Sequence, residues 1–244
     1  MNEFLKQVKD ELIYSFKPPF WWLSTLFFNF VLAVLAISYS NYFHHHYFRV
    51  GLIGLIMSTW LLADVTATNQ LGADPERYEL MRKKGFTPIH ILTIRNVMLT
   101  LIILPVSVLF VIVGDALNHN LKTLFIDLVI TIVPIGPWLG FGNLISAVLP
   151  YKQILIKTRL KHPSTIIPWL LKMSLPYVAS TFTVPFCLWP LYITKLYGRK
   201  NISSHFVVDF IVVFSWSIFI FALGTYLSHR YLRHEPNKID ALKF

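Results

Sequence analysis

The chain has 244 residues, of which 55% are hydrophobic and 14% are charged, and its mean hydropathy is positive. This composition is too apolar for an ordinary soluble domain and is typical of a membrane protein. The net charge of +10 then reflects how loops are distributed across the membrane and an attraction to anionic lipid, so it does not indicate nucleic-acid binding. The single cysteine, Cys187, excludes a disulfide or a cysteine-based metal cluster within one chain.

Residues 1–17 have the spacing of an amphipathic helix. Apolar side chains recur every fourth residue, and the polar side chains between them face elsewhere. The apolar residues are Phe4, Val8, Leu12 and Phe16, with Leu5 and Ile13 beside them, and the polar residues are Lys6, Gln7, Lys9 and Asp10. We expect this helix to lie in the membrane interface rather than across the bilayer, with a disordered amino-terminal tail as the alternative.

Six apolar segments are long enough to cross a hydrocarbon core, which takes about 20 helical residues. They lie near residues 20–40, 50–68, 91–113, 125–147, 165–194 and 206–227. We therefore expect an all-α membrane protein whose residues 1–244 form a single transmembrane domain with six spans. The fifth segment is longer than one crossing needs, which predicts a span followed by a partial, re-entrant hairpin.

The distribution of basic residues predicts the orientation of these spans. Seventeen of the 22 lysine and arginine residues fall in the terminal segments and loops on the side of the membrane that would hold both termini. Basic residues concentrate in short cytoplasmic loops. We expect a multi-pass protein of the cell membrane, whether inner or plasma membrane, with both termini in the cytoplasm.

Residues 74–88 form a compact polar unit between the second and third apolar segments. Asp74 can cap a helix whose first residue is Pro75, and Gly85 can end that helix. Thr87 and Pro88 repeat the cap and first-turn proline at once. The sequence therefore predicts a short surface helix, a sharp corner and a long helix that enters the lipid.

Isolated charged or histidine residues in and between the spans offer few sites for chemistry. Asp64 in the second segment is a functional candidate because intramembrane acids usually are, but a hydrated helix end explains it equally well. Arg95, near the cytoplasmic start of the third segment, has a similar depth and could pair with Asp64. The run His44–His46 lies between the first two segments, and consecutive residues point in different directions, so we expect an external turn rather than a metal site.

Small and polar residues gather in the second half of the fourth segment, where Gly142, Asn143 and Ser146 lie close together. Small residues let helices approach closely, and Asn and Ser can hydrogen-bond across them. This pattern predicts a helix–helix contact or a wall of a translocation path, with generic close packing inside the subunit as the alternative.

The sequence contains no H-E-x-x-H, no G-x-S-x-G and no G-x-x-x-x-G-K-[ST] pattern. We therefore expect no catalytic residue, no metal ligand and no cofactor on this chain.

Two local patterns occur within this six-span layout: Glu79-Leu80-Met81-Arg82-Lys83-Lys84-Gly85 with Pro88, and Gly142-Asn143-Leu144-Ile145-Ser146 with Pro150. With the layout, they make the chain similar to the permease subunits of ATP-binding-cassette exporters of the type-two class. In that family the short helix docks in a cleft of a separate ATPase subunit, which holds the ATP and Mg²⁺. The resemblance implies that the ATPase-coupling residues are Glu76, Glu79, Arg82 and Lys83 on a polar face, Tyr78 and Met81 on an apolar face, and Gly85.

The resemblance also implies the partners and the cargo. The partners would be separate ATPase subunits, a second permease chain and the lipid bilayer, and the cargo would be an amphipathic or hydrophobic drug, lipid or antimicrobial peptide that leaves the cell. Two other classes stay open. One is a membrane scaffold or assembly factor that transports nothing, and the other is a membrane enzyme that uses His44–His46 or Asp64.

Overall fold

The computed structural model describes residues 3–17, 69–72, 74–117, 124–150 and 202–234, and five single helical positions, which are Val31, Leu35, Ile167, Leu171 and Ser174. Within these residues the structure is helical and contains no strand, as the predicted all-α class requires. Apart from the single positions, the predicted spans near 20–40, 50–68 and 165–194 lie outside this part of the chain. Asp64 and His44–His46 lie outside it as well.

Two of the described helices are long and apolar enough to cross a membrane, over Pro88–Ala116 and Phe210–His234. The first belongs to α6, Pro88–Leu117, and the second to α11, Ile202–His234. Only 33% and 17% of their apolar stretches are buried within the protein, so neither is covered as the core helix of a soluble domain would be. They correspond to the third and sixth predicted spans.

The fourth predicted span, near 125–147, is divided into α7, Leu124–Ile132, and α8, Ile135–Val148. The break has a local cause in the prolines at its centre. Pro137 has no N–H, so it cannot donate to the carbonyl of Val133 four residues earlier. Ser217 of α11 takes over this role, and its hydroxyl donates to Val133 O at 2.6 Å.

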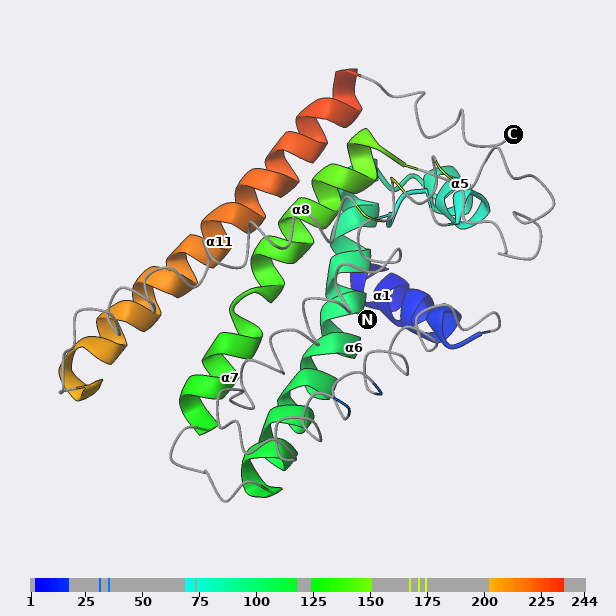
Figure 1. The fold of residues 1–244 in the computed structure, drawn as a ribbon. Coiled ribbons are helices and arrows are strands. Elements are labelled where there is room, and N and C mark those ends of the chain that lie inside the picture. The colour runs from blue at the N-terminus through cyan, green and yellow to red at the C-terminus, as the bar shows by residue number, and fades with distance from the viewer. Residues whose placement is uncertain are drawn as a thin grey trace.

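The pair formed by α8 and α11 lies side by side along most of α8 (Figure 1). Glycines allow this approach, because the backbones of Gly140 and Gly224 are in direct contact. A Cβ atom on Gly140 would lie 2.8 Å from the carbonyl oxygen of Ile220, and one on Gly136 would lie 2.6 Å from the Ser217 hydroxyl. The small residues therefore determine how closely these two helices pack.

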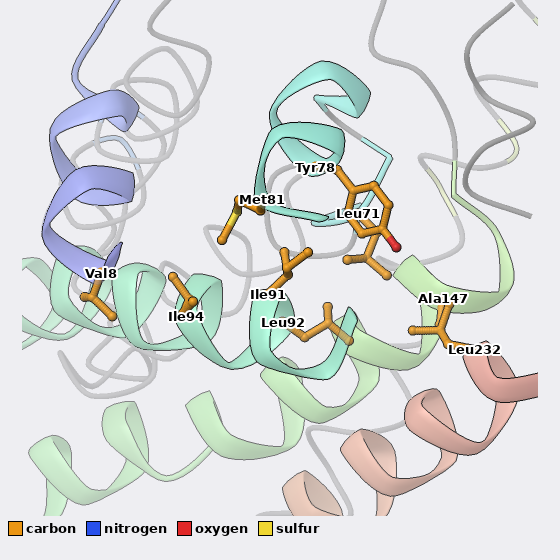
Figure 2. Close-up of a cluster of buried hydrophobic side chains, with 9 residues drawn as sticks. All are labelled: Val8, Leu71, Tyr78, Met81, Ile91, Leu92, Ile94, Ala147 and Leu232. Carbon is orange, nitrogen blue, oxygen red and sulfur yellow. The ribbon is translucent and has the colours of Figure 1, made fainter. Parts of the chain in front are cut away.

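The remaining described helices are α1, Glu3–Ser15, and α5, Pro75–Lys83. Both lie near the end of the bundle where α6 begins, and α1 packs against α6 (Figure 1). A buried apolar cluster at this end contains side chains from α1, α5, α6, α8 and α11 (Figure 2). Its members are Val8, Leu71, Tyr78, Met81, Ile91, Leu92, Ile94, Ala147 and Leu232. This cluster fixes the position of α5 relative to the long helices.

Candidate functional site

The short helix α5 begins as the sequence predicts. Asp74 Oδ1 accepts a hydrogen bond from the backbone N–H of Arg77 at 2.9 Å, and Pro75 is the first helical residue. The cap satisfies one of the N–H groups that the first turn leaves without a helical partner. The predicted start of this helix is confirmed.

The end of α5 is a Schellman motif built on Gly85. This glycine has φ +87°, its N–H donates to Arg82 O at 2.9 Å, and the N–H of Phe86 donates to Met81 O at 3.2 Å. Thr87 then caps the next helix, because its hydroxyl accepts from the N–H of His90 at 3.4 Å. The chain thus leaves one capped helix and enters another within four residues, which confirms the predicted corner.

The side chains of α5 divide into a buried and an exposed set. Tyr78 and Met81 are buried in the cluster of Figure 2, with 4% and 1% of their surface exposed. The exposed residues are Glu76, Arg82, Lys83 and Lys84, and Glu79 is half-buried. Glu79 pairs with Lys83 at 3.3 Å on the surface, and the Arg82 guanidinium donates to Phe86 O at 3.0 Å.

Leu80 is the residue on this helix that the sequence interpretation missed. Its side chain is 51% exposed, although Tyr78 and Met81 of the same helix are buried. It follows Tyr78 by two positions, which places the two on different faces of a helix. This spacing in the sequence could have predicted that Leu80 is exposed if Tyr78 is buried. The outward surface of α5 therefore carries one leucine surrounded by charged groups.

A partly buried ion pair joins α1 to α5. Arg77 Nε lies 2.7 Å from Glu11 Oε1, and Arg95 of α6 lies 3.8 Å from the other carboxylate oxygen. The Glu11 and Arg95 side chains are 4% and 8% exposed, so water screens these charges poorly. One carboxylate thus links three helices.

A second contact between the same helices lies beside this pair. The Tyr14 hydroxyl donates to Asp74 Oδ2 at 2.6 Å, and the Arg77 guanidinium lies 4.7 Å from the centre of the Tyr14 ring. The hydrogen bond to Asp74, together with partial burial, raises the pKa of Tyr14 to about 12. Asp74 therefore caps α5 and anchors α1 at the same time.

The orientation predicted for α1 needs a correction. Gln7, which was predicted to face away from the apolar side, is buried with Val8 and donates to Glu11 Oε1 at 3.3 Å. Phe16, predicted on the apolar face, is 53% exposed, and Leu5 and Ile13, predicted beside that face, are exposed as well. The physical reason is Glu11, which turns this side of the helix toward the two arginines. Glu11 follows Val8 by three positions, so its place on that face was readable from the spacing.

Asn143 and Ser146 lie in a buried polar group that connects α8 with its neighbours. The Gln70 amide nitrogen donates to Asn96 at 2.9 Å and to Asn143 at 3.3 Å. Asn143 in turn donates to Thr225 of α11 at 3.0 Å, and the Ser146 hydroxyl accepts from the N–H of Leu71 at 2.7 Å. Gly142 is also buried. These contacts hold residues 69–72, directly ahead of α5, against the long helices.

Arg95 contacts Glu11, and its predicted partner Asp64 lies outside the described residues. Over the described ranges, no group of three or more His, Cys, Asp or Glu side chains is placed to hold a metal ion. Comparison with protein-family models, with curated proteins and with solved structures finds no match to this chain.

Proposed function

We propose that this chain is the transmembrane permease subunit of an ATP-driven exporter, with six spans and both termini in the cytoplasm. The observation that carries the proposal is the rigid anchoring of α5, which is capped at its start, closed by a Schellman motif and tied to α1 and α6 through Glu11. A separate ATPase subunit docks on the outward surface of α5 and supplies the ATP and Mg²⁺.

Membrane placement is supported by the charges of α6. Arg95 and Asp115 are 20 residues apart, and a rise of 1.5 Å per residue separates them by about 30 Å. This matches a hydrocarbon core about 30 Å thick. The residues between them carry no formal charge. Arg95 then lies at one boundary, with α1 and α5 beside it, and the bias of basic residues makes this the cytoplasmic boundary.

Rigidity is what a coupling element needs. A flexible loop would absorb a displacement of the ATPase, whereas a helix packed on its neighbours passes the displacement to them. Tyr78 and Met81 pack against the start of α6, and Leu71 and Ser146 join the preceding turn to α8. A push on α5 therefore reaches the long helices directly.

The outward surface of α5 has the composition of a docking site. Leu80 is exposed on this surface, and the exposed charged residues one turn away from it are Glu76, Lys83 and Lys84. An apolar anchor within a polar rim is typical of protein interfaces. A second permease chain completes the transporter, and its cargo is an amphipathic or hydrophobic drug, lipid or antimicrobial peptide.

The test is recovery of an ATPase subunit with the detergent-solubilised chain from its own host. We expect the wild type to recover a nucleotide-binding protein, and we expect Leu80→Asp and the double variant Glu76→Lys/Glu79→Lys to lose it. Glu3→Lys, an exposed acid on α1, is the control and should recover the ATPase as the wild type does. Each variant is first shown to elute as the wild type in size-exclusion chromatography.

Two outcomes contradict the proposal. If the wild type recovers no ATPase under gentle conditions, a membrane scaffold or assembly factor becomes the better description. If the α5 variants recover the ATPase as well as the wild type does, then the docking surface lies elsewhere on the chain.

A further inference from the structure

The face of α1 that points away from the protein has a pattern of its own. Gln7, Val8 and Glu11 are buried, whereas Leu5 and Ile13 are 56% and 50% exposed. These two apolar residues belong to one row of four-residue spacing that alternates apolar and basic side chains. The row consists of Leu5, Lys9 and Ile13, and Lys17 follows the helix, which ends at Ser15.

The fully exposed charges on this face are basic. Lys9 lies in the row, Lys6 lies beside it, Lys17 follows the helix, and all three are exposed. Among the described residues, the structure records no ion pair for any of these lysines. Two acids border the face next to Lys6: Glu3 is exposed three positions before it, and Asp10 is half-buried four positions after it.

The position of α1 along α6 sets the depth of this face. Val8 packs in a cluster with Ile91 and Ile94, and the Ser15 hydroxyl lies 3.1 Å from the sulfur of Met98. Under the proposed membrane placement, this range of α6 brackets Arg95 at the edge of the hydrocarbon core. The outward face of α1 then meets the layer where acyl chains give way to headgroups.

We propose that this face binds the phosphate-bearing headgroups of anionic lipids, with Leu5 and Ile13 in the acyl region and the three lysines at the phosphates. The inference rests on the proposed membrane placement and extends it to a lipid class. A zwitterionic surface would suit the apolar residues alone, whereas the unpaired lysines favour a negative one. Each lysine near an anionic surface contributes about 1 kcal/mol of attraction, which corresponds to about a fivefold local enrichment of anionic lipid.

The bound lipid also affects the candidate docking site on α5, because α1 is joined to α5 through Glu11 and Tyr14. Lipid that holds α1 at the boundary holds the base of α5 as well. Anionic lipid would therefore help to fix the orientation in which α5 meets its partner.

The test places a fluorophore on the outward face of the full chain. Cys187→Ser removes the single cysteine, and Ile13→Cys is labelled and reconstituted in vesicles of equal parts phosphatidylcholine and phosphatidylglycerol. One preparation carries bromine on the acyl chains of the phosphatidylglycerol, and the other carries it on those of the phosphatidylcholine. We expect the brominated phosphatidylglycerol to quench at least twofold more strongly at low salt, and the difference to shrink in 1 M salt.

Two double variants, each of which removes two lysines, make the comparison specific. Lys6→Gln/Lys9→Gln should bring the quenching ratio close to one, and Lys83→Gln/Lys84→Gln on α5 should leave it unchanged. Equal quenching by the two lipids in the wild type would overturn the preference for anionic lipid. Absence of quenching by either lipid would overturn the placement of α1 in the interface. Recovery of an ATPase is measured separately, so either result is distinct from a failure of the docking proposal.

Discussion

Glu11 and Arg77 form a partly buried ion pair at 2.7 Å although 66 residues separate them in the chain. The pair belongs to a small group that also contains Arg95, 3.8 Å from Glu11, and Asp74, whose carboxylate accepts from the backbone N–H of Arg77 and from the Tyr14 hydroxyl. Charges balance within this group, which is the condition for burying them. The amino-terminal helix α1 is therefore attached to α5 by charged groups whose ion-pair partners lie on a different helix.

The first prediction concerns Glu11→Gln, which keeps the size of the side chain and removes its charge. Two arginines would then be left near each other with reduced compensation, and the free energy of unfolding should fall by about 3 kcal/mol. For a chain of this length that corresponds to a Tm lower by about 6 °C or more in detergent. Glu3→Gln, on the exposed side of the same helix, should leave the Tm unchanged. Equal Tm values for Glu11→Gln and the wild type would mean that the pair does not hold α1 in place.

The second prediction concerns pH. The hydrogen bond to Asp74 raises the pKa of Tyr14 from 10.0 to about 12, so the folded protein favours the neutral phenol. The resulting stabilisation is complete below pH 10 and is lost as the pH rises toward 12. The difference between the phenolate absorbance titrations of the wild type and Tyr14→Phe should therefore show a midpoint near 12. In Asp74→Asn the midpoint should move toward 10, and a Tyr14 midpoint near 10 in the wild type would contradict the contact.

The third prediction concerns the proline break between α7 and α8. Ser217→Ala removes the donor to Val133 O, and an unpaired carbonyl in an apolar setting should cost about 1–3 kcal/mol. Pro137→Ala restores a backbone N–H that can reach the same carbonyl. The loss from Ser217→Ala should then be much smaller in the Pro137→Ala background. Ser215→Ala, at an exposed position of α11, is the control, and purely additive effects of Ser217→Ala and Pro137→Ala would disprove the exchange of donors.

The fourth prediction concerns the glycine contact between α8 and α11. Gly140→Leu places a side chain where even a Cβ atom lies 2.8 Å from the Phe221 Cα atom, so the two helices must separate. We expect a loss of about 1–3 kcal/mol, measured as a lower Tm and faster proteolysis of α11. Ala222→Leu also enlarges a small residue, at an exposed position of the partner helix α11, and should have little effect. A Gly140→Leu protein as stable as the wild type would show that the backbones do not pack this closely.

Local signals made the region of residues 74–88 predictable from the sequence. A cap, a first-turn proline and a glycine with positive φ each act over three or four residues, so Asp74, Pro75 and Gly85 fix the helix without help from the rest of the chain. The long apolar helices α6 and α11 were predictable for a related reason. Their hydropathy is a property of each segment by itself.

The partners of the polar side chains were decided by the tertiary structure alone. Glu11 meets arginines 66 and 84 residues away, and Asn143 meets Gln70 and Thr225. Which charge or amide ends up opposite another depends on how helices from distant parts of the chain pack, and no short window of sequence carries that information. Local sequence therefore determined the start and end of α5 and the presence of the long apolar helices α6 and α11. Packing determined which side of α1 and α5 is buried and which is left for a partner.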